Sequence, residues 1–297
     1  MEDIDEHLKI AGFNDIDIVN KFIKKYPCEN SYYNICNLFT WDLALNLKYM
    51  IYQDRLILFN PFFPYLLEPI GEKFSVEELV RIHCIFEKKY KNVEILAVSE
   101  DYINNNKANL SGYFDIRSDE NLNDYIYLAE NLVKLSGKKL AKKKNLISQF
   151  KKLYPDFTVN PIEKNDYIKI IEFYHHWKNT HNAEGEHLDS ELEAIKIILT
   201  NWDLLPCNGL KLCIGSKMCA FSIFSPQTAD MATVHFEKYD AEIKGAGQII
   251  NHETAKALLN DYKYINREQD MGSVGIRQAK RSYQPIKMLP FYRLKSK

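Results

Sequence analysis

The chain has 297 residues, with 46 % hydrophobic and 13 % aromatic residues, which is typical of a packed globular protein with room for two domains. This composition excludes a disordered chain, and no apolar run approaches the roughly 20 residues that a membrane-spanning helix needs. The formal net charge is −1, which excludes a strongly charged protein overall but hides an uneven distribution of basic residues. Because the N-terminus is acidic where a signal peptide would be basic, we expect a cytoplasmic protein without a membrane span.

The first half of the chain starts with a helix and continues with strands. Apolar residues at helical spacing predict a helix over Asp15–Tyr26, which Pro27 ends. Short apolar runs then predict three strands, a helix that begins with the capping pair Ser75 and Glu78, and one more strand. The strands are expected over Leu47–Tyr52, Arg55–Asn60, Leu66–Ile70 and Val93–Val98, and the helix ends near Tyr90.

The same order of elements returns in the second half. After a basic helix that ends near Tyr154, the elements expected are helices over Asp166–Lys178 and Leu188–Trp202, a hairpin around Gly215-Ser216, a strand over Met231–Phe236, a helix over Ile249–Asn260 and a strand from Tyr262. Three sequential strands, a crossover helix and another strand predict a mixed, mainly antiparallel sheet flanked by helices. We therefore expect an α/β protein of two similar units, over residues 1–154 and 155–297.

A loop with two glycines separates the strand and the helix in the second copy alone. In Lys244-Gly245-Ala246-Gly247-Gln248, small residues let backbone N–H groups close on an anion at the start of the helix. The matching connection in the first copy, Gly71-Glu72-Lys73-Phe74-Ser75, has one glycine and an acid that disfavours phosphate. An ordinary strand-to-helix turn explains the loop equally well. If the loop binds an anion, only the second unit is expected to hold a phosphate-bearing donor.

Two stretches of the chain are strongly basic. Seven lysines and no acid lie within Lys138–Lys152, and seven basic residues and no acid lie within Arg277–Lys297. Solvated helix faces are the usual outcome of such runs. The alternatives are binding of the phosphates of a nucleotide donor, or a surface for tRNA or anionic lipid.

The sheet order and several motifs resemble known acyltransferases. A glycine loop that opens the helix after a long central strand resembles the GNAT acyltransferases, in which the loop amides hold the pyrophosphate of coenzyme A. The chain also resembles a bacterial family that is related to the C-terminal domain of phosphatidylglycerol lysyltransferase. The resemblance lies in the lysine-rich run at 134–145 and in the motifs His235-x-Glu237-Lys238, Asn266-Arg267-Glu268-x-Asp270-x-Gly272 and Gly275-x-Arg277-x-Ala279-Lys280-x-x-Tyr283-x-Pro285. This resemblance covers both halves and implies two GNAT-like units in tandem.

The resemblance implies transfer of an acyl or aminoacyl group from coenzyme A or aminoacyl-tRNA to an amine or hydroxyl. Such a reaction needs a base for the attacking group, donors for the oxyanion and an acid for the leaving group. Tyr283 is the candidate acid, although a packed tyrosine is the simpler interpretation of one tyrosine among 19. The candidates for the base, or for gripping a cationic substrate, are Glu237, Glu268 and Asp270, which could instead pair with Lys238, Arg267 or Arg277.

The donor is expected beside the glycine loop and the basic residues that follow it. The candidate contacts are Lys244, Gly245, Ala246, Gly247, Gln248, Arg277, Lys280 and Arg281. Lys143, Lys144 and Asn145 are the second choice for contacts with the donor. A tRNA would contact Lys138–Lys152 and Arg277–Lys297, and the acceptor is expected to be a small molecule or an anionic group. Two other classes stay open, namely a non-catalytic protein that senses a charged metabolite and a nucleic-acid-binding module.

No metal is expected. The six cysteines show no Cys-x-x-Cys spacing, which indicates neither a zinc site nor a disulfide framework. The polar stretch with His175, His176, His181 and His187 lacks the His-Glu-x-x-His spacing of a catalytic zinc site. Exposed loop histidines are therefore the preferred interpretation.

Overall fold

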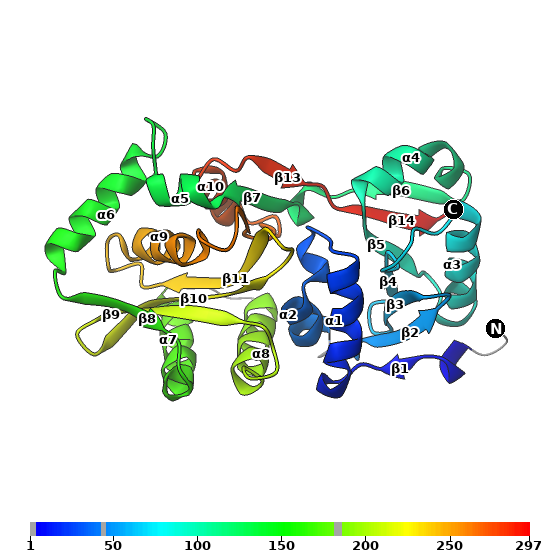
Figure 1. Cartoon of the computed structure of the whole chain (residues 1–297), viewed down its shortest axis with the longest axis horizontal. Coiled ribbons are helices and arrows are strands. Elements are labelled where there is room, and N and C mark those ends of the chain that lie inside the picture. Colours follow the sequence, from blue (N-terminus) through cyan, green and yellow to red (C-terminus); the bar gives the residue numbers. More distant parts are fainter. Residues whose placement is uncertain (1–3, 43–45, 181–185) are drawn as a thin grey trace. The chain divides into compact units, whose positions relative to one another are not determined.

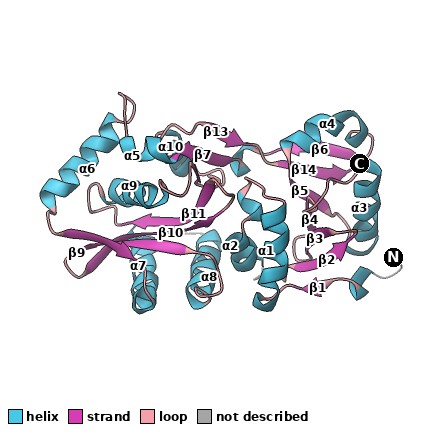
Figure 2. Cartoon of the chain, viewed as in Figure 1, coloured by secondary structure: helices cyan, strands magenta, loops and turns pink. Residues whose placement is uncertain are grey.

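The computed structural model describes residues 4–42, 46–180 and 186–297, in which the chain forms two compact units. Unit 1 comprises Met1–Asp124 with Leu289–Lys297, and unit 2 comprises Tyr125–Met288. Each unit contains one mixed sheet flanked by helices, as the sequence predicted, and each sheet has seven strands (Figures 1 and 2). Within these described ranges, no helix is long and apolar enough to cross a membrane.

The sheet of unit 1 has the strand order β1-β2-β3-β4-β5-β14-β6. Its neighbours are antiparallel except for β4 and β5, which run parallel and are joined by the crossover helix α3. The predicted capping box at the start of α3 is confirmed, because Ser75 and Glu78 exchange side-chain-to-backbone hydrogen bonds of 2.8 and 3.2 Å. The strands are β1 (Lys9–Ile10), β2 (Lys48–Tyr52), β3 (Arg55–Asn60), β4 (Tyr65–Leu67), β5 (Glu94–Val98), β6 (Phe114–Ser118) and β14 (Tyr292–Ser296), and the helices are α1 (Ile16–Lys25), α2 (Ile35–Asn37), α3 (Val76–Tyr90) and α4 (Glu100–Leu110).

The sheet of unit 2 has the strand order β13-β7-β12-β11-β10-β9-β8. Here β11 and β12 are the parallel pair, and the buried helix α9 is their crossover. The strands are β7 (Asp124–Leu128), β8 (Phe157–Pro161), β9 (Asn208–Ile214), β10 (Lys217–Pro226), β11 (Met231–Tyr239), β12 (Tyr264–Asn266) and β13 (Lys287–Leu289), and the helices are α5 (Ala129–Lys134), α6 (Ala141–Leu153), α7 (Tyr167–Thr180), α8 (Glu186–Thr200), α9 (Ala246–Leu258) and α10 (Val274–Arg281).

Each sheet takes one strand from the other half of the sequence. In unit 2, β12 pairs antiparallel with β7, which precedes all the other strands of that sheet in the chain. In unit 1, β5 pairs antiparallel with β14, the last strand of the protein. The division at Asp124 therefore differs from the boundary expected after Tyr154, because α5 and α6 pack on α9 and belong to unit 2. Periodicity along the chain carries no information about this exchange.

Strand β11 is much longer than its parallel partner β12. The two strands pair only through Met231–Thr233 and Tyr264–Asn266, so the rest of β11 extends beyond the pairing. On its other side, β11 is antiparallel to β10, and the register passes from Phe236 directly to Val234. His235 is therefore the extra residue of a β-bulge, a feature that bends a strand and redirects a side chain.

Both glycines of the predicted anion loop are needed for close packing. Gly245 has φ +93°, and a Cβ atom there would lie 2.8 Å from the carbonyl oxygen of Leu146 and 2.9 Å from Cβ of Phe150, both on α6. A Cβ atom on Gly247 would lie 2.8 Å from the ring of Tyr239. Helix α6 therefore packs directly against Gly245, and Tyr239 packs against Gly247.

We expect Gly245→Ala to lower the melting temperature by about 5–10 °C. The alanine must adopt a left-handed backbone, at roughly 1–2 kcal/mol, and must push α6 away, at roughly 1–3 kcal/mol. Gly215→Ala is the matched control, because Gly215 also has a positive φ (+59°) but no atom within 4 Å of the added Cβ. Calorimetry that found equal decreases for the two variants would contradict the packing role of Gly245.

Candidate functional site

The candidate site lies where β11 extends beyond its pairing with β12. Glu237, on this part of β11, accepts a hydrogen bond of 2.8 Å from Arg267, which directly follows β12. Its other carboxylate oxygen accepts a hydrogen bond of 3.1 Å from Asn251 on α9. The Glu237–Arg267 ion pair therefore spans the opening between the two strands, and both of its side chains are 12 % exposed.

Arg267 lies among aromatic rings and close to a second cation. Its guanidinium is 5.7 Å from the ring centre of Tyr127 and 5.2 Å from that of Tyr283. The ammonium of Lys143, on α6, lies 4.4 Å from the ring centre of Tyr283. Burial and then the charge of Arg267 lower the pKa of Lys143. Two cations thus lie near the Glu237 carboxylate in a partly dry environment, and Arg267 is the one that pairs with it.

Unpartnered polar atoms gather around Glu237. Seven buried side-chain polar atoms of the described residues have no hydrogen-bond partner, and three of them belong to residues next to this carboxylate. They are Nη1 of Arg267, Oδ1 of Asn251 and Oγ of Ser222, which is opposite Glu237 on β10. Buried polar groups are usually satisfied, so such a concentration indicates a place for a polar ligand or ordered water. We call Lys143, Ser222, Glu237, Asn251, Arg267 and Tyr283 the Arg267 cluster.

Tyr283 lies in this cluster, and its surroundings favour a hydrogen-bonding role. Burial raises the pKa of Tyr283 well above its ordinary value, and the positive charge of Arg267 offsets only part of this effect. The side chain of Gln248, at the start of α9, slightly lowers the pKa of Tyr283. The phenol therefore stays protonated and is better suited to donating a hydrogen bond than to releasing its proton.

Glu268 points to a different partner from its neighbour Arg267. Its Oε1 lies 2.8 Å from Nδ1 of His235, the residue at the bulge of β11. The other ring nitrogen of His235, Nε2, lies 2.8 Å from Oγ of Ser225 on β10. The sequence motifs contained His235 and Glu268 but gave no reason to join them, and Ser225 was not predicted at all.

Asp270 is the third acid predicted for the site, and its contacts favour a structural role. Its fully buried carboxylate receives hydrogen bonds from Nε and Nη2 of Arg277 at 2.8 Å, from the Tyr125 hydroxyl at 2.6 Å and from the Gly272 amide at 2.9 Å. The Arg277 hydrogen bonds, above all, lower the pKa of Asp270 to about 2. A carboxylate so fully engaged is a poor base, and it fixes the loop that carries Arg267 and Glu268.

The remaining basic residues predicted for the donor site divide into two groups. Lys280 also fixes the loop, because its ammonium donates to the backbone oxygens of Arg267, at 2.6 Å, and of Gln269. Lys244 and Arg281 are exposed, whereas Gly245, Ala246 and Gly247 are buried. The C-terminal basic stretch is also divided, since Arg293 belongs to unit 1 and there lies 3.4 Å from both Glu94 and Asp119.

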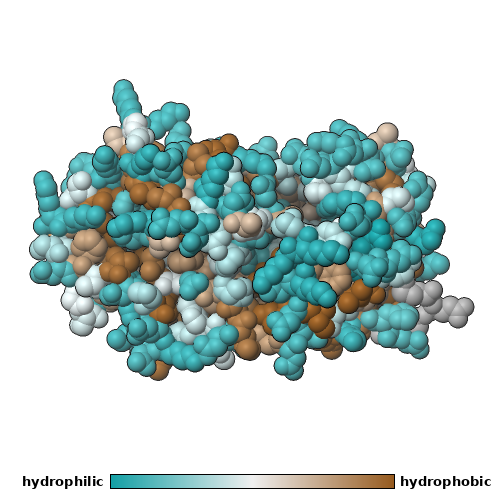
Figure 3. Space-filling view, in the orientation of Figure 1, coloured by the Kyte–Doolittle hydropathy of each residue, from teal (hydrophilic) through white to brown (hydrophobic). Residues whose placement is uncertain are grey.

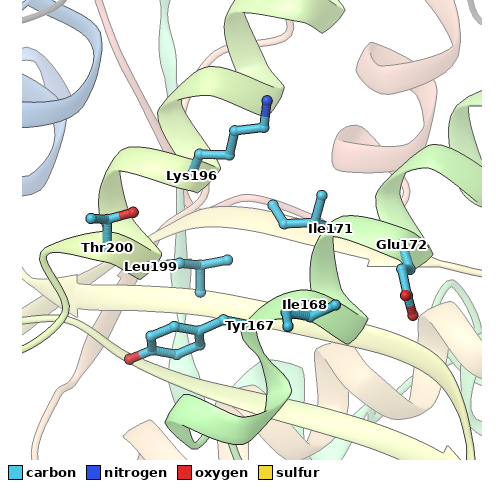
Figure 4. A pocket seen from close by; sticks show the side chains of 7 residues that line it. All are labelled: Tyr167, Ile168, Ile171, Glu172, Lys196, Leu199 and Thr200. Atoms are coloured by element: carbon cyan, nitrogen blue, oxygen red, sulfur yellow. The ribbon is translucent and has the colours of Figure 1, made fainter.

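A separate pocket and the histidine-rich stretch lie elsewhere. A pocket of about 270 Å³ between α7 and α8 is lined mainly by apolar side chains and contains none of the predicted site residues (Figure 4). Within the part of the chain that the structure describes, no group of three His, Cys, Asp or Glu residues could hold a metal ion. His181 and Glu184 lie outside the described residues, as do the side chains of Glu186 and His187.

The fold and the family are confirmed by comparison with known proteins. A tandem GNAT protein from the clavulanic acid biosynthesis pathway is similar in fold over 97 % of this chain and 98 % of its own, with a TM-score of 0.52 and 8 % identity. The chain is thus a tandem GNAT-like α/β protein. Residues 24–295 match the family described as phosphatidylglycerol lysyltransferase, C-terminal, and the chain belongs to this acyltransferase family.

Two further structures extend the comparison. A conserved protein of unknown function from Bacteroides thetaiotaomicron is 29 % identical, with a TM-score of 0.91 over 98 % of this chain and 99 % of its own. L-PGS from Bacillus licheniformis is 14 % identical, with a TM-score of 0.66 over 97 % of this chain and 93 % of its own. No curated protein matches the sequence.

We expect Asp270→Asn to cost about 2 kcal/mol of unfolding free energy at pH 6. The folded-state pKa of Asp270 is about 2, below its ordinary value of 3.8, so its stabilisation is present above about pH 4 and is lost as the pH falls toward 2. The wild type should therefore lose about 2 kcal/mol more than the variant over that interval. Urea unfolding at several pH values measures this, and parallel curves for the two proteins would rule out a stabilising ionised Asp270.

Proposed function

We propose that the protein transfers an aminoacyl group from aminoacyl-tRNA to a hydroxyl or amine, with the Arg267 cluster as its reaction centre. The observation that carries this proposal is the group of unpartnered buried atoms around Glu237, together with the ion pair of Glu237 with Arg267 and the second cation, Lys143, close by. When an ester is attacked, negative charge develops on its carbonyl oxygen. The unpaired N–H group of Arg267 and the ammonium of Lys143 are suited to stabilise that charge.

The surroundings of the glycine loop favour tRNA over coenzyme A as the donor. The carbonyl oxygen of Leu146 faces Gly245 closely and would repel a pyrophosphate placed there. Helix α6 turns Lys143 toward Tyr283 and leaves Lys142 and Lys144 exposed. Hydrophilic side chains lie along the outer edge of the face shown in Figure 3, over α6. An exposed lysine face of this kind fits the phosphate backbone of a nucleic acid.

The family suggests the group to be transferred and the acceptor to test first. Its description names a phosphatidylglycerol lysyltransferase, so lysyl-tRNA and phosphatidylglycerol are the first substrates to examine. Small amines and hydroxyl compounds form the second panel, because a shared fold transfers more safely than a shared substrate. Formation of a lysylated product from labelled lysyl-tRNA tests the proposal directly, and no product from either panel would refute it.

We expect the triple variant Lys139→Gln, Lys142→Gln and Lys144→Gln to bind tRNA at least tenfold more weakly at low salt. Each lost phosphate contact also reduces the salt dependence of log K by about 0.9, so the slope should become shallower by up to about 3. The control replaces three exposed lysines of unit 1, Lys21, Lys24 and Lys88, and removes the same charge. Filter binding between 50 and 200 mM salt distinguishes the two triple variants, and equal losses of affinity would contradict a specific role of the basic stretch Lys138–Lys152.

Acetyl-coenzyme A provides a complementary test of the donor. Because the glycine loop is covered by α6, we expect acetyl-coenzyme A to leave the melting temperature unchanged at micromolar concentration. A clear increase in melting temperature would instead support the coenzyme A donor that GNAT-like folds also suggest. The same titration with lysyl-tRNA should stabilise the wild type.

We expect Arg267→Lys to reduce kcat/KM for aminoacyl transfer by at least about 100-fold. Lysine keeps the positive charge but lacks the planar guanidinium. In the guanidinium, one N–H group pairs with Glu237 while another stays available. Arg117→Lys, at an exposed position in unit 1, should leave transfer unchanged. Activity of Arg267→Lys within a few-fold of the wild type would exclude directional hydrogen bonding by this guanidinium.

A further inference from the structure

Three side chains beside the Arg267 cluster form a continuous hydrogen-bonded line. Ser225, His235 and Glu268 come from β10, from the bulge of β11 and from the loop after β12, and the two contacts that join them are both 2.8 Å long. We infer that Ser225 and His235 are positioning residues for Glu268, which acts as the general base. The inference rests on the proposed function, because it assigns the group that activates the acceptor.

The chemistry of the three groups sets the direction of the hydrogen bonds. An ionised carboxylate only accepts, so Nδ1 of His235 carries a proton and donates to Glu268. In the neutral ring this leaves Nε2 to accept from the Ser225 hydroxyl. This arrangement fixes the tautomer and the orientation of the ring, and the ring in turn holds one oxygen of the Glu268 carboxylate in place.

Exposure decides which end of the line meets the substrate. Ser225 is 1 % exposed and the His235 side chain is fully buried, whereas the Glu268 side chain is 17 % exposed. A serine nucleophile would have to reach the donor carbonyl, and Ser225 is enclosed. Proton exchange with an acceptor therefore takes place at Glu268, and Ser225 and His235 act through it.

The backbone holds Glu268 in a conformation that its residue type does not favour. Its φ is +55°, a left-handed conformation that costs a residue with a Cβ atom roughly 1–2 kcal/mol. The amide of Glu268 donates to Oδ1 of the buried Asn266 at 2.7 Å, and its carbonyl accepts from the amide of Tyr125 at 3.3 Å. Glycine or asparagine would fit the same backbone at lower cost. A strained glutamate whose side chain is also held by His235 fits a functional requirement for the carboxylate.

The assigned step balances as follows. Glu268 takes a proton from the acceptor N–H or O–H while the acceptor atom forms a bond to the aminoacyl carbonyl carbon. The bond between that carbon and the ribose oxygen of the tRNA then breaks. The departing oxygen leaves as a hydroxyl with the proton that Glu268 held, so Glu268 returns to the carboxylate form.

The test compares four variants in the full-length protein. We expect Glu268→Gln to reduce kcat about 100- to 10,000-fold, the usual range for loss of a general base. His235→Leu should reduce kcat at least tenfold with little change in KM, and His235→Asn, which keeps an N–H donor near the Nδ1 position, should recover most of that loss. His83→Leu removes a buried histidine of unit 1 and should leave kcat unchanged. An unchanged kcat in His235→Leu, or no rescue by asparagine, would overturn the positioning role.

Two further measurements separate this inference from the proposed function. Nitrogen NMR of labelled histidine should show His235 protonated at Nδ1 in the wild type, with a signal that shifts in Glu268→Gln. Protonation at Nε2 alone would overturn the positioning role of His235, even if the enzyme is active. Wild type with the expected tautomer but no product would refute the proposed function instead. Ser225→Ala should retain kcat within about tenfold, and a trapped acyl group on Ser225, detected by mass spectrometry, would show a nucleophile rather than a positioning residue.

Discussion

The candidate site depends on the buried carboxylate of Asp270. Strand β12 has only three residues, and the backbones of Arg267 and Glu268 exchange two more hydrogen bonds with Tyr125 before the chain leaves the sheet. Beyond that point Asp270 holds the chain by binding Arg277 of α10, Tyr125 of β7 and the amide of Gly272 at once. With this loop fixed, the consecutive residues Arg267 and Glu268 can reach different partners on β11.

The two ion pairs across the opening have different characters. Arg267 and Glu237 lie among aromatic rings, with Lys143 close by and several polar atoms unpartnered, which suits a site that develops or receives negative charge. Glu268 and His235 instead continue into a fully connected line that ends at Ser225. In a regular strand, His235 and Glu237 would lie on the same face. The bulge at His235 redirects its side chain, so His235 and Glu237 contact different partners.

Much of the fold was predictable from sequence, because helix and strand periodicity, capping residues and turn glycines are local. The central strands and the crossover helix of each half and the Ser75 capping box were confirmed in this way, whereas β1, β6, β7 and β8 were not predicted. The exchange of β7 and β14 was not predictable, since it pairs segments from opposite halves of the chain. For the same reason no local pattern indicated that Tyr125 and Tyr127, which precede the expected boundary, would line a site built largely from residues beyond 220.

The glycine loop shows why composition alone could not define the donor site. Glycine is required both where an anion meets backbone amides and where another segment packs too closely for a Cβ atom, and the two requirements look identical in a sequence. The neighbours of Gly245 and Gly247, which are α6 and Tyr239, show that the second requirement holds here. The same helix places Lys143 over the ring of Tyr283 and under the influence of the Arg267 charge, so one element both packs on the loop and supplies a cation to the candidate site. Because like charges in a dry environment repel, the unliganded protein keeps an unfavourable interaction that a bound anion would relieve.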